Sequence, residues 1–208
     1  MRAGGTIFSY SIVLENITIL DISSQKIDQI GCLPFGLVSL SCSNNKLTKL
    51  PPFPETLTAI DCSSNKIAGT LILNDNLEIL KCMNNKINYI STFTDINESN
   101  LTADEKLIIT KKYKNNVNLC PKNLKELNCH SNCLTQLPKL NNGLQNLFCE
   151  NYDLKKLPVL PKTLIMCDFI VNAPLRNANN QPYIIDWSGY TITLTHDLIT
   201  QYNILLGK

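Results

Sequence analysis

Apolar residues recur along this chain with a period of 20 positions, in two blocks separated by a longer gap. Seven copies of the pattern begin at Ile17, Leu37, Leu57, Leu77, Leu124, Leu144 and Leu164. Numbered from that residue, positions 4 and 6 of every copy are apolar or Cys, and the residues at positions 3, 5 and 7 alternate with them. Alternation over five residues predicts a short β-strand with one buried side.

The shared pattern, LxxLxCxxNxL, is the template of a leucine-rich repeat. One unit cannot bury its apolar side alone, but stacked units share a continuous core, so the sequence predicts a solenoid with a parallel sheet on its concave face. Asn recurs at position 9, where its amide can bond turn backbone in a ladder running through the stack. Tyr152 holds this position in the sixth copy, so we expect that turn to be rebuilt.

Proline marks the return path between successive strands, as in Pro51, Pro52, Pro138 and Pro158. Proline fixes φ and removes a hydrogen-bond donor, and 20 residues leave little room for a full helix. The sequence therefore predicts an extended, polyproline-like convex side with short 3₁₀ turns.

Two regions depart from the repeat. The 47 residues from Leu77 to Leu124 exceed one period by 27, which places an insert at about 94–119. Within it, Thr102 can cap a short helix in which acidic residues come first and lysines last. We predict an N-terminal cap over 1–16, repeats over 17–177 and a C-terminal cap over 178–208, the last including strands near 183–186 and 190–195.

The repeats resemble a known family. Leu50-Pro-Pro-Phe-Pro and Leu157-Pro-Val-Leu-Pro are similar to the LPxLP leucine-rich repeats of bacterial secreted effectors. Asn-rich, Cys-bearing repeats of this kind are also similar to those of amoeba-infecting giant viruses. The resemblance covers residues 17–177 and implies a binding module. Some effectors of that group carry a ubiquitin-ligase domain with a Cys-x-Asp motif, which no Cys of this chain matches.

Charge and cysteine usage narrow the class of protein. The 19 basic and 17 acidic residues give a net charge of +2, which argues against nucleic-acid binding through bulk charge and against a basic membrane-surface protein. We expect no transmembrane helix and no secretory signal. The nine cysteines are odd in number, and five share one buried position, which predicts free thiols in a reducing intracellular compartment. For a viral or bacterial protein, that compartment is the host cytoplasm.

Candidate chemistry is sparse. Cys129, His130 and Cys133 form the densest cluster of metal-ligating residues, but strand alternation sends Cys129 inward and His130 outward. The only other histidine is His196, and no phased nucleophile accompanies either one. We therefore predict no catalytic residues, metal or cofactor, and no small-molecule substrate. A thiol or metal enzyme is the least favoured alternative.

The outward strand positions carry the functional prediction. They are small and polar in the early repeats and larger in the later ones, where apolar residues lie among charges as in an interface core with a polar rim. The predicted partner-binding residues are Ile79, Lys81, Met83, Glu126, Asn128, His130, Phe148, Glu150, Met166 and Asp168. They predict capture of a protein partner on the concave face, and for a viral or bacterial protein that partner is a host protein. Two alternatives stay open: a structural, self-assembling repeat protein, or apolar residues such as Phe148 and Ile170 covered by the insert or cap.

Overall fold

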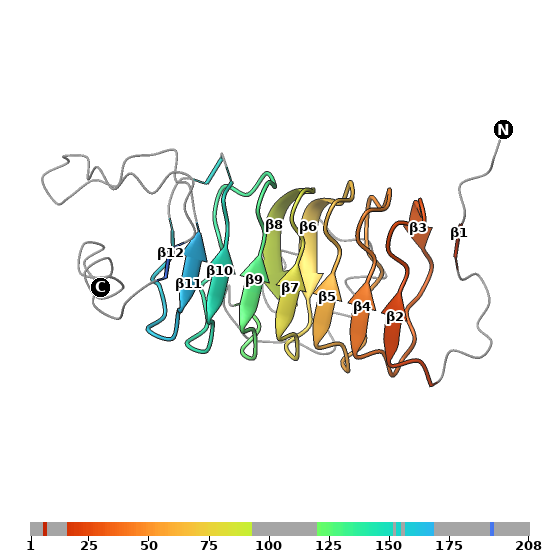
Figure 1. Ribbon diagram of the computed structural model, residues 1–208, viewed down its shortest axis with the longest axis horizontal. Coiled ribbons are helices and arrows are strands. Elements are labelled where there is room, and N and C mark those ends of the chain that lie inside the picture. The colour runs from red at the N-terminus through yellow and green to blue at the C-terminus, as the bar shows by residue number, and fades with distance from the viewer. Residues whose placement is uncertain are drawn as a thin grey trace, which may run out of the picture.

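The computed structural model describes residues 6–7, 16–92, 120–151, 153–154, 157–168 and 192–193, and its main feature is one long sheet (Figure 1). Seven parallel strands of three residues each are β2 (Ile19–Asp21), β4 (Ser39–Ser41), β5 (Ala59–Asp61), β7 (Ile79–Lys81), β9 (Glu126–Asn128), β10 (Asn146–Phe148) and β11 (Met166–Asp168). An eighth strand, β12 (Ile192–Thr193), pairs antiparallel with β11. The sheet order is β12-β11-β10-β9-β7-β5-β4-β2.

Strand pairing follows the predicted register. Position 4 of each unit lies opposite position 4 of the next, as in Leu20 with Leu40 and Ile60 with Leu80. The register continues across the insert, where Leu80 of β7 pairs with Leu127 of β9. The predicted solenoid with a parallel sheet is therefore confirmed.

Several predicted segments fall outside the described residues. They include the helix of the insert and nearly all of both predicted caps. The exceptions are β12 and β1 (Thr6–Ile7), which pairs parallel with β3 (Gln29–Ile30). Within the part of the chain that the structure describes, no helix is long and apolar enough to cross a membrane.

The core consists of columns of identical or similar side chains. Five thiols at position 6 are completely buried: Cys42, Cys62, Cys82, Cys129 and Cys149. Leucine or isoleucine columns at positions 1, 4 and 11 flank them. Burying a leucine side chain contributes about 1.5–3 kcal/mol, and because each unit shares its core with its neighbours, most of that gain comes from stacking.

The predicted asparagine ladder is present. Asn45 Nδ2 donates to the carbonyls of Cys42 and of Ile22 in the preceding unit, and its Oδ1 accepts from Ile27 N at 3.0 Å. Asn65, Asn85 and Asn132 repeat these contacts. Each side chain thus bonds backbone groups of two units, and a carbonyl such as that of Cys42 accepts from two successive ladder amides.

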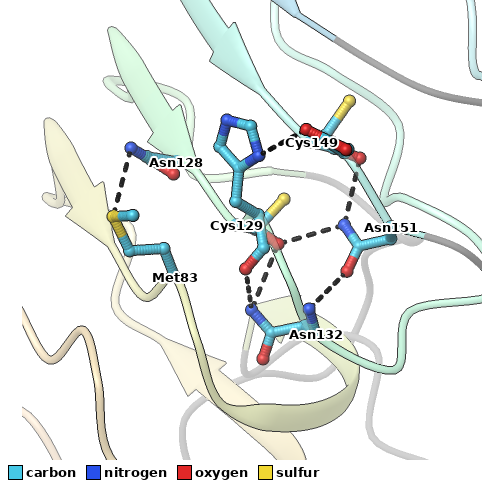
Figure 2. A network of polar contacts seen from close by, with 8 residues as sticks. Met83, Asn128, Cys129, Asn132, Cys149 and Asn151 are labelled. Carbon is cyan, nitrogen blue, oxygen red and sulfur yellow. Dashed lines mark hydrogen bonds and ion pairs between the residues drawn. The ribbon is translucent and has the colours of Figure 1, made fainter. Parts of the chain in front are cut away.

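The sixth unit keeps the ladder by a route that the sequence did not indicate. Asn151, one position before Tyr152, is completely buried and donates to the carbonyls of Cys129 and Cys149, both at 3.0 Å (Figure 2). Its Oδ1 accepts at 2.7 Å from Asn132 N, at position 9 of the preceding unit, as Asn45 Oδ1 accepts from Gln25 N at 3.0 Å. In each of the five preceding units, the residue at position 8 has a left-handed φ of 49° to 58°. Asn151 holds position 8 of the sixth unit and does not have a positive φ. The altered turn is what lets position 8 reach the ladder.

The prediction for the return side is wrong for two units. There, β6 (Ala68–Leu73) and β8 (Lys86–Thr92) form a parallel two-stranded sheet, which lies behind β5 and β7 in Figure 1. The described residues include no 3₁₀ segment. These two units lack proline in their return path, so their backbone N–H groups can form a ladder. Gly69, with φ of 79°, lies at the one register shift in this pairing.

Candidate protein-binding surface

We call the side chains at positions 3, 5 and 7 of the units the outward sheet face. Strands β4, β5, β7, β9 and β10 each place a buried central residue between two half-buried ones, as the alternation predicted. Nine of the ten predicted binding residues have described side chains, and all nine are half-buried on this face. The tenth, Asp168, ends β11 opposite Phe148, and its side chain lies outside the described part.

Hydrogen bonds link several of the small side chains on the early half of the outward sheet face. Ser23 Oγ lies 2.6 Å from Ser41 Oγ and accepts from Ser43 Oγ at 3.2 Å. Asp21 accepts from the backbone N–H of Ser23, which lowers the pKa of its carboxyl group. Asp61 Oδ1 accepts from Ser63 N at 2.9 Å. On the same half of the face, Ser63 Oγ is buried without a hydrogen bond and Ile19 is 74% exposed.

The centre of the face is a loose polar patch. Lys81 Nζ lies 3.5 Å from Glu126 Oε1, and the Lys81 side chain is 44% exposed. Exposed ion pairs contribute little to folding stability, so both groups can exchange partners at low cost. Next to them, Asn128 Nδ2 lies 3.9 Å from Met83 Sδ (Figure 2), while Asn128 Oδ1 is buried without a hydrogen bond. A thioether is a weak acceptor, so Asn128 is poorly satisfied here.

The later half holds an aromatic pair. The rings of His130 and Phe148 stack with centroids 6.3 Å apart and an interplanar angle of 14°. Glu150 Oε2 lies 3.5 Å from His130 Nδ1, which orients the imidazole and forms an ion pair when that ring is protonated. Stacked rings at this separation hold each other in place. The result is a pair of stacked rings beside charged groups on the outward sheet face.

The predicted cluster of metal-ligating residues does not come together, because Cys129 and His130 lie on opposite sides of the strand. Cys129 is completely buried, whereas His130 lies on the outward sheet face. Burial raises the pKa of the Cys129 thiol, which keeps it protonated and unreactive at neutral pH. Among the described residues, no three His, Cys, Asp or Glu side chains are grouped closely enough to hold a metal ion. His196 lies outside the described residues.

Sequence reasoning identified the residues of this face but missed their contacts. His130 is at position 7 of its unit and Phe148 at position 5 of the next, so they meet diagonally across β9 and β10. Ser23 and Ser41 meet through the same diagonal relation. Diagonal neighbours on one sheet face are within reach of each other, and this rule could have suggested both pairs.

Parallel strands in register, a buried Leu and Cys core and an asparagine ladder define a leucine-rich repeat solenoid. Solved structures show the same fold. YopM from Yersinia enterocolitica WA-314 matches with a TM-score of 0.56 and 21% identity, over 76% of this chain and 33% of YopM. YopM from Yersinia pestis, a leucine-rich effector protein, matches with a TM-score of 0.52 and 22% identity, over 76% of this chain and 43% of that one.

This chain thus aligns with less than half the length of either YopM structure. At such identities the likeness establishes the fold and not the task. No family model matches the sequence, and no curated protein matches it significantly.

Proposed function

We propose that this chain is a non-enzymatic interaction module that binds a protein partner on the later half of the outward sheet face, the predicted concave face. The observation that supports this most is the stacked His130 and Phe148 pair, which lies near the exposed Lys81–Glu126 ion pair. Aromatic side chains surrounded by charged groups are the usual anchors of protein interfaces. On the early half Ser23, Ser41 and Ser43 bond one another, and positions 3, 5 and 7 of the first three units carry no aromatic residue.

In the proposed mechanism, apolar groups supply the contact area and charged groups orient the partner. Phe148, Met166, Met83 and Ile79 supply the apolar area. Methionine adapts to irregular partner surfaces because its side chain is unbranched and polarisable. Lys81, Glu126, Glu150 and Asp168 set the orientation of the partner, which affects specificity and association rate more than affinity.

The likeness to leucine-rich effectors suggests which partner to seek. YopM from Yersinia pestis is a leucine-rich effector protein. By analogy, the partner proposed for this chain is a host protein, met in a reducing host cytoplasm. A viral origin and the LPxLP type remain predictions from the sequence, as does self-assembly, the alternative function.

A double variant tests the proposed function. The partner is captured on the tagged chain from host-cell lysate, identified by mass spectrometry, purified and titrated against Lys81→Glu, Phe148→Ala. Loss of an aromatic anchor and reversal of a facing charge should each cost at least 1–2 kcal/mol, which together weaken Kd by about 100-fold. Isothermal titration calorimetry measures the change.

The matched control is Lys139→Glu, Val159→Ala. Both residues are exposed and occupy position 16 of neighbouring units, on the return path rather than on the outward sheet face. The control makes the same two kinds of change and should bind within about twofold of the unmodified chain. Equal affinity of the two double variants would contradict the placement of the site. Thermal melts of both verify that each variant is folded.

A further inference from the structure

A line of lysines runs along a different surface of the repeats. Position 10, just after the ladder asparagine, is lysine in each of the first four units: Lys26, Lys46, Lys66 and Lys86. All four are exposed, and we call them the lysine column. The column ends where position 10 becomes Cys133 and then Asp153 in the next two units.

Backbone hydrogen bonds set the spacing of the lysine column. The N–H groups of Lys46, Lys66 and Lys86 donate, at 2.7 to 2.8 Å, to the carbonyl of position 11 in the preceding unit. The same link at every step stacks these turns in register. Because neighbouring backbones paired in this way lie about 4.8 Å apart, the four side chains leave the surface over roughly 15 Å.

The charges of the lysine column are not compensated. Among the residues that the structure describes, none of the four ammonium groups has a carboxylate within ion-pair distance, and the two lysines that do are Lys81 and Lys125. Like charges on adjacent strands repel one another. The chain has a net charge of +2, so subtracting the column, 2 − 4, leaves −2 for everything else. The column is a local concentration of positive charge on a chain that is otherwise slightly acidic.

We propose that the lysine column binds an extended acidic segment of a protein partner, a run of Asp and Glu residues. In an extended segment, side chains on one side recur about every 6.8 Å, so roughly 15 Å of column faces about three carboxylates. Lysine is a flexible point charge, and its four-carbon stem absorbs the difference between this spacing and that of the repeats. Bound carboxylates would also relieve the repulsion within the column.

Neighbouring positions distinguish this partner from other polyanions. Positions 9 and 12 beside the column are Gln, Asn, Asp, Thr and Ala, with no aromatic side chain on which a nucleic-acid base could stack. The exposed large apolar residues of the early units, Ile19, Phe35 and Val38, lie before or within the strands, whereas the column follows them. A membrane surface would therefore find no apolar side chains to insert beside these charges.

Peptide binding tests the proposal directly. The probe is a fluorescein-labelled octaglutamate peptide, titrated with the full chain and followed by fluorescence anisotropy at ~20 mM salt. The column variant replaces Lys26, Lys46, Lys66 and Lys86 with Gln. The control replaces Lys122, Lys125, Lys139 and Lys162, four exposed lysines of the later units, and thus removes the same charge. We expect the column variant to bind at least ~10-fold more weakly than the unmodified chain, and the control to bind within ~2-fold of it.

Several results would overturn the proposal. Equal losses in the two variants would show attraction to net charge alone, and undetectable binding by the unmodified chain would remove the site. Octathymidylate and phosphatidylserine-containing vesicles are tested as competing ligands of the lysine column. If either binds the column more tightly than octaglutamate does, the column belongs to another class of partner. The column variant leaves Lys81 and Phe148 unchanged, so its outcome is independent of the binding site on the outward sheet face.

Discussion

Replacing Asn132 with Ala should lower the free energy of unfolding by about 2 kcal/mol, because the side chain links backbone groups of two units. Asn132 Nδ2 donates to the carbonyls of Cys82, Cys129 and His130, and its Oδ1 accepts from Ile87 N. The side chain is only 8% exposed, so water cannot readily replace it. Each of the three carbonyls keeps a second donor: Asn85 Nδ2 for Cys82, Asn151 Nδ2 for Cys129 and Asn84 N for His130. Alanine therefore removes the acceptor of Ile87 N and weakens the bonding of three carbonyls, and a buried polar group left without a partner costs about 1–3 kcal/mol.

Two further variants make this result specific to the ladder. Asn142→Ala alters an exposed Asn of the following turn and should change stability by no more than about 0.5 kcal/mol. Asn132→Asp keeps the shape but turns a carboxylate oxygen toward the three carbonyls, so it should be at least as damaging as alanine. Denaturant unfolding followed by circular dichroism measures all three. A difference below about 1 kcal/mol between Asn132→Ala and Asn142→Ala would show that the ladder does not hold the units together.

Alkaline pH should unfold the protein between about pH 10 and 11, because the folded core keeps its thiols protonated. Burial raises the pKa of Cys42 and of Cys120 from 9.0 to about 12. Burial also raises the pKa of Cys62, Cys82 and Cys129 well above 9.0. Below pH 9 these thiols are protonated in both states and stability does not change. Above it only the unfolded chain releases the protons, so stability falls.

The size of the alkaline effect follows from the number of thiols. Each buried thiol removes about 1.4 kcal/mol per pH unit above 9, so five remove about 10 kcal/mol by pH 10.5. That is comparable to the whole stability of a typical domain. Circular dichroism against pH measures the transition.

The triple variant Cys42→Ala, Cys62→Ala, Cys82→Ala separates thiols from other groups. It should be less stable at neutral pH because of its cavities, but it should lose stability above pH 9 at about two-fifths of the original slope. An unchanged slope would assign the transition to tyrosine or lysine instead. Thiol counting with Ellman's reagent checks the burial itself: the exposed Cys32 and half-buried Cys133 should react in the folded chain, and the seven buried cysteines only after denaturation.

The strand register could be predicted because it depends on one number, the period of 20. Even the pairing of Leu80 with Leu127 across the insert follows from the sequence, since Pro121-Lys-Asn-Leu124 copies the segments before earlier strands. The β6–β8 sheet requires two consecutive units to lack proline, whereas the prediction for the return path rests on the units that contain it. The rescue of the ladder by Asn151 depends on the backbone of one turn, which a period does not describe.

For the candidate site too, the sequence predicts some features and not others. Alternation within short strands places Lys81, Glu126, His130 and Phe148 on one face, and burial agrees with that placement. Their contacts, Lys81 with Glu126 and His130 with Phe148, depend on rotamers and on diagonal neighbours in adjacent strands. A repeat pattern fixes which residues share a face, whereas the pairs that give the face its chemistry are decided by side-chain packing.

Site-specific photocrosslinking tests the central claim most directly. A benzophenone amino acid replaces Phe148 on the outward sheet face in one protein and Val159 on the return path in another, and each is irradiated with the captured partner. We predict a covalent complex from position 148 and none from position 159, with the crosslinked peptide identified by mass spectrometry. Crosslinking from position 159 alone would contradict the account, because the partner would then lie on the return side of the solenoid.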